Sequence, residues 1–337
     1  MKKILIIREG AIGDVVHTTN VFRSIKETYP NVEIDYVTGP VPAQLLQNDS
    51  RLNRVIVLES KKYSYLFKLA SQLRKEKYDL IINLQPSLRF KFLAFMCFAK
   101  KVVNYKKTYK LHAVENFFRT AKKALKEIEN PNDLKLEIPD DILERVKADI
   151  PQDKKIVIFN TQTSPTRHGR KWPIKYYKEL ALCILENYDC NILIAGSKED
   201  MEKVKVFENL HPNIKIIAGN YSIMESAAGF FFAHVFVSSA HVFSLADVFV
   251  SGDTGPLHIA SAVSKPFCIG LYGAAPPGRT GPWGINHFAV SADLSCIPCN
   301  KRNCLISEYS STDINPCMSA IKPEHVLRVI IDNDLLV

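Results

Sequence analysis

The alternation of short apolar runs with longer amphipathic stretches is the feature that most constrains the fold of this 337-residue chain. An apolar run over residues 3–8 ends in a turn with two glycines, Gly10 and Gly13, and a helical pattern follows over residues 15–28. Strands and helices that alternate in this way form a parallel sheet covered by helices on both faces. Further strands are expected at residues 32–37, 55–58, 80–84 and 101–104, and helices near residues 63–74 and 88–98.

The alternation starts again after a polar, proline-containing stretch at residues 149–153. We therefore expect two Rossmann-like α/β domains, residues 1–150 and 151–337, that face each other across a cleft, with the last helix packed back on the first domain. Open parallel sheets bind ligands at the carboxyl ends of their strands, so the active site is expected in that cleft. The second domain should contain strands at residues 155–160, 191–195, 214–218, 248–251 and 266–271, and a helix over residues 173–187.

The composition excludes several classes of protein. With 47% apolar and 23% charged residues, the chain is neither disordered, collagen-like nor a coiled coil. The apolar run near the N-terminus stops at Arg8 and Glu9, which is too early for a secretory signal. The most apolar stretch, residues 227–250, is interrupted by His234, His241 and Asp247, which favours a buried segment over a membrane span. These features predict a cytoplasmic protein.

The positive charge is concentrated in the first predicted domain. Residues 1–150 contain 27 Lys and Arg against 18 Asp and Glu, whereas residues 151–337 contain 17 of each. Such asymmetry indicates an acidic partner, which can be nucleic acid, an anionic membrane surface, or a phosphorylated or carboxylated substrate. A basic surface that only keeps the protein in solution remains the alternative.

Asp14 follows the first glycine turn, at the start of a predicted helix. The turn lacks the G-x-G-x-x-G spacing of a dinucleotide site. Asp14 is therefore interpreted either as the N-cap of the helix or as a general base that deprotonates an attacking hydroxyl in the cleft.

A second candidate segment covers residues 251–258, where a strand is followed by Pro256 in the first turn of a helix. The backbone N–H groups of Thr254 and Gly255 would then point at an anion, helped by the helix dipole. His258, one turn further, could add a hydrogen bond or a positive charge. The alternative is an ordinary capped helix with a buried histidine.

Three cations, Arg167, Arg170 and Lys171, follow the first strand of the second predicted domain. Arginine and lysine at this place could neutralise a diphosphate leaving group without a metal ion. A solvated basic loop is the alternative.

Together these segments resemble one family. The resemblance includes residues 8–18, Lys171-Trp172-Pro173 and Asp253-Thr254-Gly255-Pro256-Leu257-His258. It covers nearly the whole chain and identifies it as similar to the bacterial heptosyltransferases of glycosyltransferase family 9, which build the inner core of lipopolysaccharide. The resemblance implies a GT-B fold and an inverting, metal-independent transfer of heptose from ADP-L-glycero-D-manno-heptose. The acceptor would be the Kdo or the first heptose of the lipopolysaccharide core.

The resemblance also implies roles for individual residues. Asp14 becomes the catalytic base, and Gly13 and His17 contact the acceptor. Arg170 stands where the family usually has a lysine, and Glu225 is the best match for a ribose-binding glutamate, although its spacing from Ser222 also fits a capping box. The donor-binding residues implied in this way are Arg170, Lys171, Glu225, Asp253, Thr254, Gly255 and His258.

Four of the eight cysteines are clustered near the C-terminus. They follow the pattern C-x2-C-x4-C-x12-C, in which a leading C-x2-C pair can hold a structural zinc. Reduced structural thiols and, in an oxidising compartment, disulfides are the alternatives. The four residues are Cys296, Cys299, Cys304 and Cys317.

The complete hypothesis is an enzyme at the inner face of the inner membrane, with peripheral membrane contact, an anionic lipopolysaccharide-core acceptor and no cofactor other than its nucleotide-sugar donor. One alternative is a GT-B glycosyltransferase with a different donor or acceptor. Another is a basic nucleic-acid-binding protein, because lysines and tyrosines are interleaved at residues 61–65 and 104–110. That alternative leaves residues 253–258 unexplained, so no nucleic-acid partner is expected.

Overall fold

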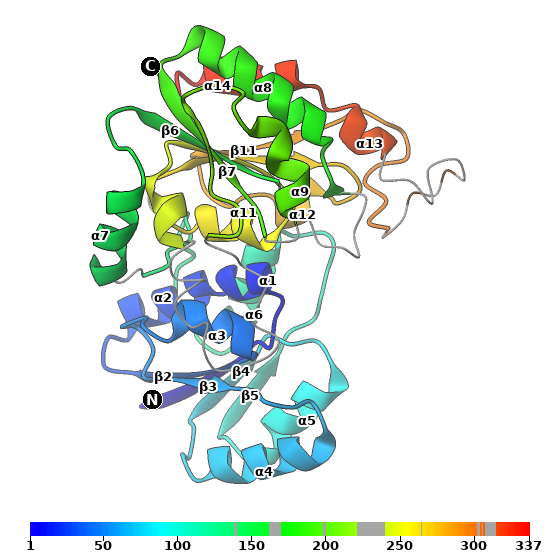
Figure 1. The fold of residues 1–337 in the computed structure, drawn as a ribbon. Helices are drawn as coiled ribbons and strands as arrows, with labels where there is room; N and C mark the ends of the chain where they lie inside the picture. The colour runs from blue at the N-terminus through cyan, green and yellow to red at the C-terminus, as the bar shows by residue number, and fades with distance from the viewer. Residues whose placement is uncertain are drawn as a thin grey trace. The chain divides into compact units, whose positions relative to one another are not determined.

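The computed structural model describes residues 1–137, 140–161, 170–197, 200–220, 240–263, 265–301, 304, 306 and 315–337. The chain forms two compact α/β units, Met1–Glu137 and Ile138–Val337 (Figure 1). Helix α7 (Asp140–Asp149) is grouped with the second unit. The domain division at residue 150 stays a prediction.

Unit 1 contains a five-stranded parallel sheet with the strand order β3-β2-β1-β4-β5. The central strand β1 (Lys3–Ile7) pairs with β2 (Glu33–Thr38) and β4 (Leu80–Asn83). Strands β3 (Arg54–Val57) and β5 (Lys101–Asn104) form the edges. Every residue of β4 and all but the first of β1 are buried, as expected for strands of a parallel sheet that is covered on both faces.

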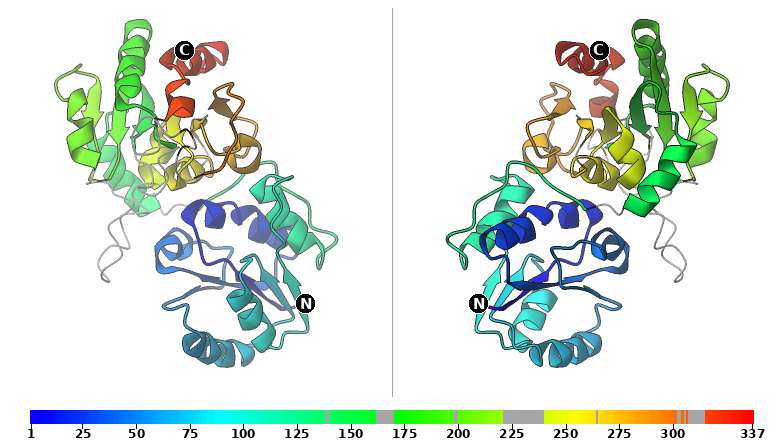
Figure 2. Two further views of the ribbon diagram at one scale, coloured as in Figure 1. Left: turned by 90° about the vertical axis from the view of Figure 1, so that its right-hand side faces the viewer. Right: turned by 90° about the vertical axis from the view of Figure 1, so that its left-hand side faces the viewer.

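Helices cover both faces of this sheet (Figures 1 and 2). Helices α4 (Tyr63–Arg74) and α5 (Leu88–Met96) pack against each other on one face, where their inner side chains join a core with Leu5 and Ile7 of β1. Helices α2 (Thr19–Thr28) and α6 (Ala113–Lys122) contact each other on the opposite face. The remaining helices of unit 1 are α1 (Ile12–Val16) and α3 (Pro40–Leu46).

The helix predicted over residues 15–28 is two helices, so that prediction was wrong in this detail. Helix α1 ends at Val16 and α2 begins at Thr19. Between them, the Thr18 hydroxyl donates to the carbonyl of Val15 at 2.6 Å and shares a 2.6 Å hydrogen bond with the Tyr36 hydroxyl. Threonine side chains that bond to nearby backbone in this way compete with helix continuation.

Unit 2 contains a six-stranded parallel sheet with the order β11-β10-β9-β6-β7-β8. The strands are β6 (Lys155–Asn160), β7 (Cys190–Ala195), β8 (Ile214–Ile216), β9 (Val248–Gly252), β10 (Phe267–Tyr272) and β11 (His287–Ser291). Five of them lie where the sequence predicts a strand. The edge strand β11 was not predicted, because its apolar run, residues 288–290, is only three residues long and only Val290 in it is buried.

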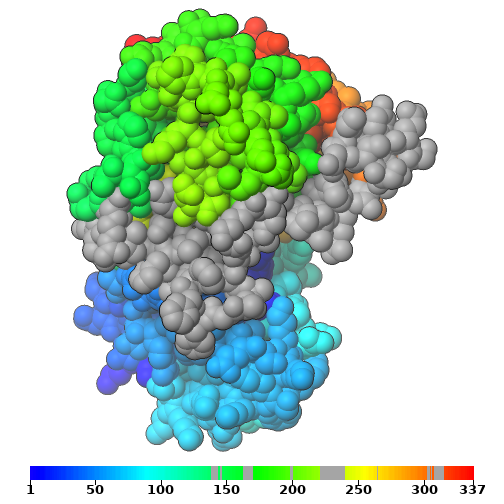
Figure 3. Space-filling model, in the orientation of Figure 1, coloured from blue at the N-terminus to red at the C-terminus, as the bar shows by residue number. Residues whose placement is uncertain are grey.

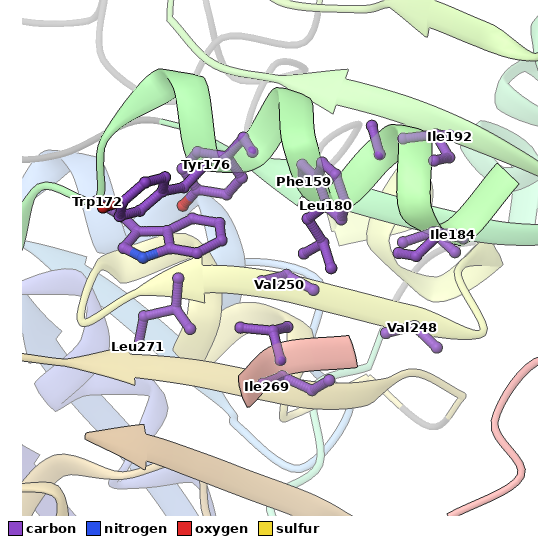
Figure 4. Packing of buried hydrophobic residues seen from close by; sticks show 14 of the residues in the cluster. Phe159, Trp172, Tyr176, Leu180, Ile184, Ile192, Val248, Val250, Ile269 and Leu271 are labelled. Atoms are coloured by element: carbon purple, nitrogen blue, oxygen red, sulfur yellow. The ribbon is translucent and has the colours of Figure 1, made fainter. Parts of the chain in front are cut away.

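The core of unit 2 lies between α8 (Ile174–Asn187) and the central strands (Figure 4). Trp172 packs edge-on against Tyr176 and Tyr177, and its indole N–H donates to the carbonyl of Ile321 at 2.8 Å. A buried indole with a satisfied N–H fixes the chain that precedes α8. The other helical elements of the described residues are α9 (Met201–Val204), a short 3-10 helix (Lys205–Phe207), α11 (Gly255–Ala260), α12 (Pro277–Thr280), α13 (Pro316–Ser319) and α14 (Pro323–Asp332).

Helix α14, the last helix, packs against α8 and β11 of its own unit. Its predicted packing on the first domain stays a prediction. Among the described residues, the structure contains no helix with the length and apolar character needed to cross a bilayer.

Candidate active site

In unit 1 the candidate site is formed where β1 ends. Arg8 follows the strand, and its backbone N–H donates to the carbonyl of Val37 at 3.0 Å. The buried guanidinium donates from Nη1 to the carbonyl of Leu84 at 2.9 Å and from Nη2 to Asp14 Oδ2 at 2.5 Å. It also lies 5.1 Å from the centre of the Phe117 ring. These contacts hold the arginine rigidly at the carboxyl edge of the sheet.

Asp14 projects from the first turn of α1, and its side chain is 31% exposed. The N-cap of α1 is Ala11, so the interpretation of Asp14 as the capping residue was wrong. A charge-assisted bond to a buried arginine fixes the orientation of a carboxylate. The arrangement therefore presents an oriented and solvent-accessible carboxylate, which is what a general base requires.

The two residues predicted to contact an acceptor, Gly13 and His17, are buried. The His17 ring packs edge-on against His112, with ring centres 5.5 Å apart. His112 in turn caps α6 by accepting a hydrogen bond from the backbone of Val114. Contact of Gly13 and His17 with an acceptor stays a prediction.

The turn between α1 and α2 is hydrogen bonded to Tyr36 of β2 through Thr18. Burial raises the pKa of the Tyr36 hydroxyl well above its usual range, so this group stays neutral. It therefore serves as the hydrogen-bond partner of Thr18 rather than as an acid. The tyrosine supports the turn that follows the Asp14 helix.

In unit 2 the candidate site begins with a close backbone contact. Gly252 ends β9, and a Cβ atom at this position would lie 2.6 Å from the carbonyl oxygen of Arg170. Only glycine allows the chain that carries Arg170 to pass so close to the strand. The contact brings together two segments that are 82 positions apart in the sequence.

Asp253 is the centre of this part of the site, and its side chain is 2% exposed. Arg170 pairs with it through Nη2 at 2.9 Å and donates from Nη1 to its backbone carbonyl at 2.9 Å. His258 Nε2 lies 3.4 Å from Asp253 Oδ1. The Thr280 hydroxyl reaches Oδ2 at 3.5 Å. A buried carboxylate with these neighbours fixes the positions of the Arg170 and His258 side chains.

Thr254 is the N-cap residue of α11, and Gly255 and Pro256 open the helix as the sequence predicts. The Thr254 hydroxyl shares a 3.1 Å hydrogen bond with Ser251. Asn160, at the end of β6, donates to the Ser251 hydroxyl at 2.9 Å and to Thr254 Oγ1 at 3.4 Å. This network fixes the start of α11, whose backbone N–H groups carry the partial positive charge of a helix N-terminus.

Tyr272 supports the Asp253 cluster from β10. Burial raises its pKa well above the usual range, and the nearby Asp253 carboxylate acts in the same direction. The neutral hydroxyl donates to the carbonyl of Thr280 at 2.5 Å. Because the Thr280 hydroxyl contacts Asp253, this bond from Tyr272 holds Thr280 in place beside the carboxylate.

The structure therefore brings together four of the predicted donor-binding residues, Arg170, Asp253, Thr254 and His258, with Gly255 directly following. Lys171 is half-buried and is adjacent to Arg170 in sequence. Glu225 lies outside the described residues.

Several residues of the site were not assigned roles from the sequence, among them Arg8, Asn160, Gly252, Tyr272 and Thr280. For Arg8 the sequence did contain a signal, because a charged residue directly follows the apolar run of β1.

The clustered cysteines line one pocket together with Asn315 and Pro316. All four are free thiols, with Cys296 exposed and Cys317 buried. Burial raises the pKa of the Cys317 thiol, and the other three cysteines add to this effect. Within the described parts of the chain, no three His, Cys, Asp or Glu side chains are grouped so that they could hold a metal ion. A zinc site stays a prediction.

Comparison with known proteins agrees with the sequence resemblance. The sequence model of glycosyltransferase family 9 (heptosyltransferase) matches residues 66–310. The lipopolysaccharide core heptosyltransferase OpsX of Haemophilus influenzae is 24% identical over an alignment of 310 positions that covers 86% of this chain and 84% of that protein.

Two solved structures have the same fold. The glycosyl transferase family 9 from Veillonella parvula DSM 2008 is 19% identical, with a TM-score of 0.78 over 99% of this chain and 97% of that chain. The E. coli heptosyltransferase WaaC with ADP-2-deoxy-2-fluoro heptose is 18% identical, with a TM-score of 0.68 over 98% of this chain and 99% of that chain. The predicted GT-B fold is confirmed.

Proposed function

Because this chain belongs to glycosyltransferase family 9, the heptosyltransferase family, we propose that it transfers heptose from ADP-L-glycero-D-manno-heptose to the inner core of lipopolysaccharide. The relative from H. influenzae is a lipopolysaccharide core heptosyltransferase, and the similar E. coli enzyme binds an ADP-heptose analogue. The observation that carries the proposal is Asp14, an oriented and accessible carboxylate held by buried Arg8 at the end of the central strand.

In the proposed reaction, an acceptor hydroxyl attacks C1 of the donor sugar from the face opposite the diphosphate. The new C1–O bond forms as the bond between C1 and the phosphate oxygen breaks, so the anomeric configuration inverts. Asp14 takes the proton of the acceptor hydroxyl, and ADP leaves with the electron pair of the broken bond. Arg8 keeps the carboxylate of Asp14 pointed in one direction during this step.

The residues of unit 2 would bind the donor. Arg170 and Lys171, with the backbone N–H groups of Thr254 and Gly255, would stabilise the negative charge that develops on the diphosphate. Asp253 would position Arg170 and His258 for this contact. We assign domain 1–150 to the acceptor and domain 151–337 to the donor, and the basic charge of the former supports binding of an anionic core.

The test is release of ADP from ADP-heptose, measured with Kdo-lipid A carrying zero or one heptose and without acceptor. Release that depends on one of the two acceptors is expected and would identify the position that is extended. If neither acceptor supports release of ADP from ADP-heptose, and the protein turns over a different nucleotide sugar, the proposed substrates are overturned. A UDP- or GDP-sugar that competes with ADP-heptose at equal concentration would do the same.

For the cysteine pocket we propose a structural zinc. The four thiols line one pocket, and thiolates are the preferred ligands of structural zinc sites. Because no three of these thiols, all of them among the described residues, are grouped here as metal ligands, zinc binding would have to draw the thiols closer together than they lie in this structure. Metal analysis of the purified protein tests it: about one zinc per chain, lost when Cys296 and Cys299 are replaced by serine, is expected. Absence of zinc in protein that keeps its thermal stability under a chelator would contradict it.

A further inference from the structure

Unit 1 exposes an apolar surface that its own fold does not require. Five large side chains from α4, α5 and the turn after α5 are half exposed or more, and Leu88 and Phe95 reach 76% and 68% exposure. In Figure 3 light-blue and cyan atoms, the colours of this part of the chain, are visible on the surface of unit 1. We call this surface the aromatic face, and it consists of Tyr63, Phe67, Leu88, Phe95 and Phe98.

Helix α5 has more apolar residues than its packing needs. Seven of its nine residues, in the sequence LRFKFLAFM, are apolar. Phe90, Leu93 and Ala94 form the inner stripe, which is buried against the sheet. A surface helix needs only one apolar stripe to cover a core, so apolar residues outside that stripe are not required by the core. Leu88 and Phe95 therefore face outward without serving the core.

The aromatic face extends over both helices, and Leu88, Phe92 and Phe95 follow one side of α5 at i, i+4 and i+7 spacing. The Phe92 ring lies between α4 and α5 and packs edge-on against Tyr63 and Phe67, with ring centres 5.9 and 5.0 Å apart. At the C-terminal end of α5, the ring centres of Phe95 and Phe98 lie 6.0 Å apart. Contiguous exposed patches of this kind mark sites of interaction with proteins or membranes, whereas single exposed apolar residues are ordinary.

The charge around the aromatic face favours an anionic partner. Residues 61–101 contain ten Lys and Arg and two Asp and Glu, a balance of +8 out of the +9 that residues 1–150 carry. Both acidic residues are neutralised by ion pairs: Glu76 with Lys3 and Asp79 with Lys100, each at 2.6 Å. Nearly all the excess charge of the chain thus lies in the segment that contains the exposed apolar residues.

The basic groups are interleaved with the rings. Arg74 lies over Phe98 at 4.3 Å from the ring centre, and Arg89 lies over Tyr63 at 5.7 Å. An arginine that stacks on an aromatic ring holds its positive charge beside that ring at the protein surface. Aromatic side chains at the level of lipid headgroups, with cations beside them, are typical of helices that lie in a membrane interface.

We propose that the aromatic face docks the protein on a bilayer of anionic phospholipid. The rings and Leu88 enter the headgroup region, and the surrounding lysines and arginines contact the lipid phosphates. A juxtamembrane cation contributes about 1 kcal/mol near an anionic surface, so several of them together give appreciable binding. A flat acidic bilayer satisfies both the apolar and the electrostatic character of this surface.

The aromatic face begins at the same sheet edge as Asp14. Lys61, directly before α4, pairs with Glu9 at 2.5 Å, and Gln85, before α5, donates to Glu9 at 3.4 Å. Glu9 follows Arg8 in the chain. This part of the inference rests on the proposed function: docking would bring a lipid-anchored acceptor to the edge of the sheet where Asp14 lies.

Co-sedimentation with vesicles tests the inference. The full chain is mixed with vesicles of phosphatidylcholine alone or of phosphatidylcholine with phosphatidylglycerol. Binding is expected to the anionic vesicles, to weaken as salt rises, and to fall at least about tenfold in the variant Leu88→Ser/Phe95→Ser. The matched control, Ile285→Ser/Phe288→Ser, removes two exposed apolar side chains from unit 2 and should bind like the original protein.

Equal binding by the original protein and the Leu88/Phe95 variant would overturn the inference, as would equal loss in the control. Sedimentation of the free protein as a dimer that the Leu88/Phe95 variant abolishes would show that a second copy covers this face instead. ADP release with a detergent-dispersed acceptor should be unchanged in the variant. Vesicle binding without any heptose transfer would refute the proposed function and leave the docking intact.

Discussion

Each unit contains an arginine–aspartate pair directly after a central strand, but the two aspartates differ in their exposure. In unit 1, Arg8 is buried and its partner Asp14 is 31% exposed. In unit 2 the relation is reversed: Asp253 is 2% exposed and its partner Arg170 is 21% exposed. The exposed member of each pair is the one that can meet a substrate. The comparison indicates that Asp14 acts on the acceptor, whereas Asp253 acts through Arg170 on the donor.

The largest effect is expected for Asp14→Asn. The amide keeps the size of the side chain and can still accept a hydrogen bond from Arg8, but it cannot take a proton. Turnover should fall by about 10²- to 10⁴-fold, the usual contribution of a general base. Steady-state ADP release measures this effect.

The control for this prediction is Asp133→Asn, which neutralises an exposed aspartate of the same unit that also pairs with an arginine, Arg23. It should leave turnover unchanged. Full activity of the Asp14 variant would contradict the role of the exposed carboxylate.

Asp253→Asn should mainly reduce stability, because it leaves the positive charge of Arg170 without its buried partner. The free energy of unfolding should fall by about 3 kcal/mol. Denaturant unfolding at neutral pH measures the loss. The same change at Asp189, an exposed carboxylate of unit 2 paired with Lys154, should cost less than about 1 kcal/mol. Similar losses in both variants would mean that burial of Asp253 has no special effect.

Gly252→Ala tests the close approach on which the unit 2 pair depends. The added methyl group would meet the Arg170 carbonyl, so the backbone must shift at a cost of about 1–3 kcal/mol. The affinity of the Gly252 variant for ADP should also fall, together with its free energy of unfolding. Gly278→Ala is the matched change, since a Cβ there meets nothing within 4 Å. Unaltered stability of the Gly252 variant would refute the packing argument.

The smallest effect is expected for Arg170→Lys. This change keeps the positive charge but removes the planar guanidinium group, which could bond to Asp253 and to a donor phosphate at the same time. Affinity for ADP should fall about tenfold while the fold is retained. Calorimetric titration with ADP measures it. Arg328→Lys, at an exposed position on α14, should bind ADP like the original protein. Equal affinity in both variants would place Arg170 outside the donor site.

Much of the fold follows from local sequence patterns. Strands β5 and β6 and helix α4 have the predicted bounds. The two strands are short apolar runs between polar residues, and the buried residues of α4, Leu66, Leu69, Ala70 and Leu73, recur at helical spacing. The break between α1 and α2 could not be predicted, since it depends on the Thr18–Tyr36 hydrogen bond between residues far apart in sequence. Pattern alone does not reveal such tertiary contacts.

The candidate site was predictable in its residues but not in its pairings. The glycine turn and the helix start at Pro256 pointed to Asp14 and Thr254 through general rules for turns and helix ends. The Arg170–Asp253 pair depends on β6 and β9 being neighbours in the sheet, although residues 161–247 separate them. The role of Arg8 likewise requires the position of Leu84 on the adjacent strand connection.

The most direct test of the contrast between the two aspartates is ADP affinity, measured by calorimetry at neutral pH for Asp14→Asn and Asp253→Asn under conditions where both are folded. The account predicts that the Asp14 variant binds ADP like the original protein, while the Asp253 variant binds at least about tenfold more weakly. Equal affinity in the two variants would contradict the division of roles between the exposed and the buried carboxylate.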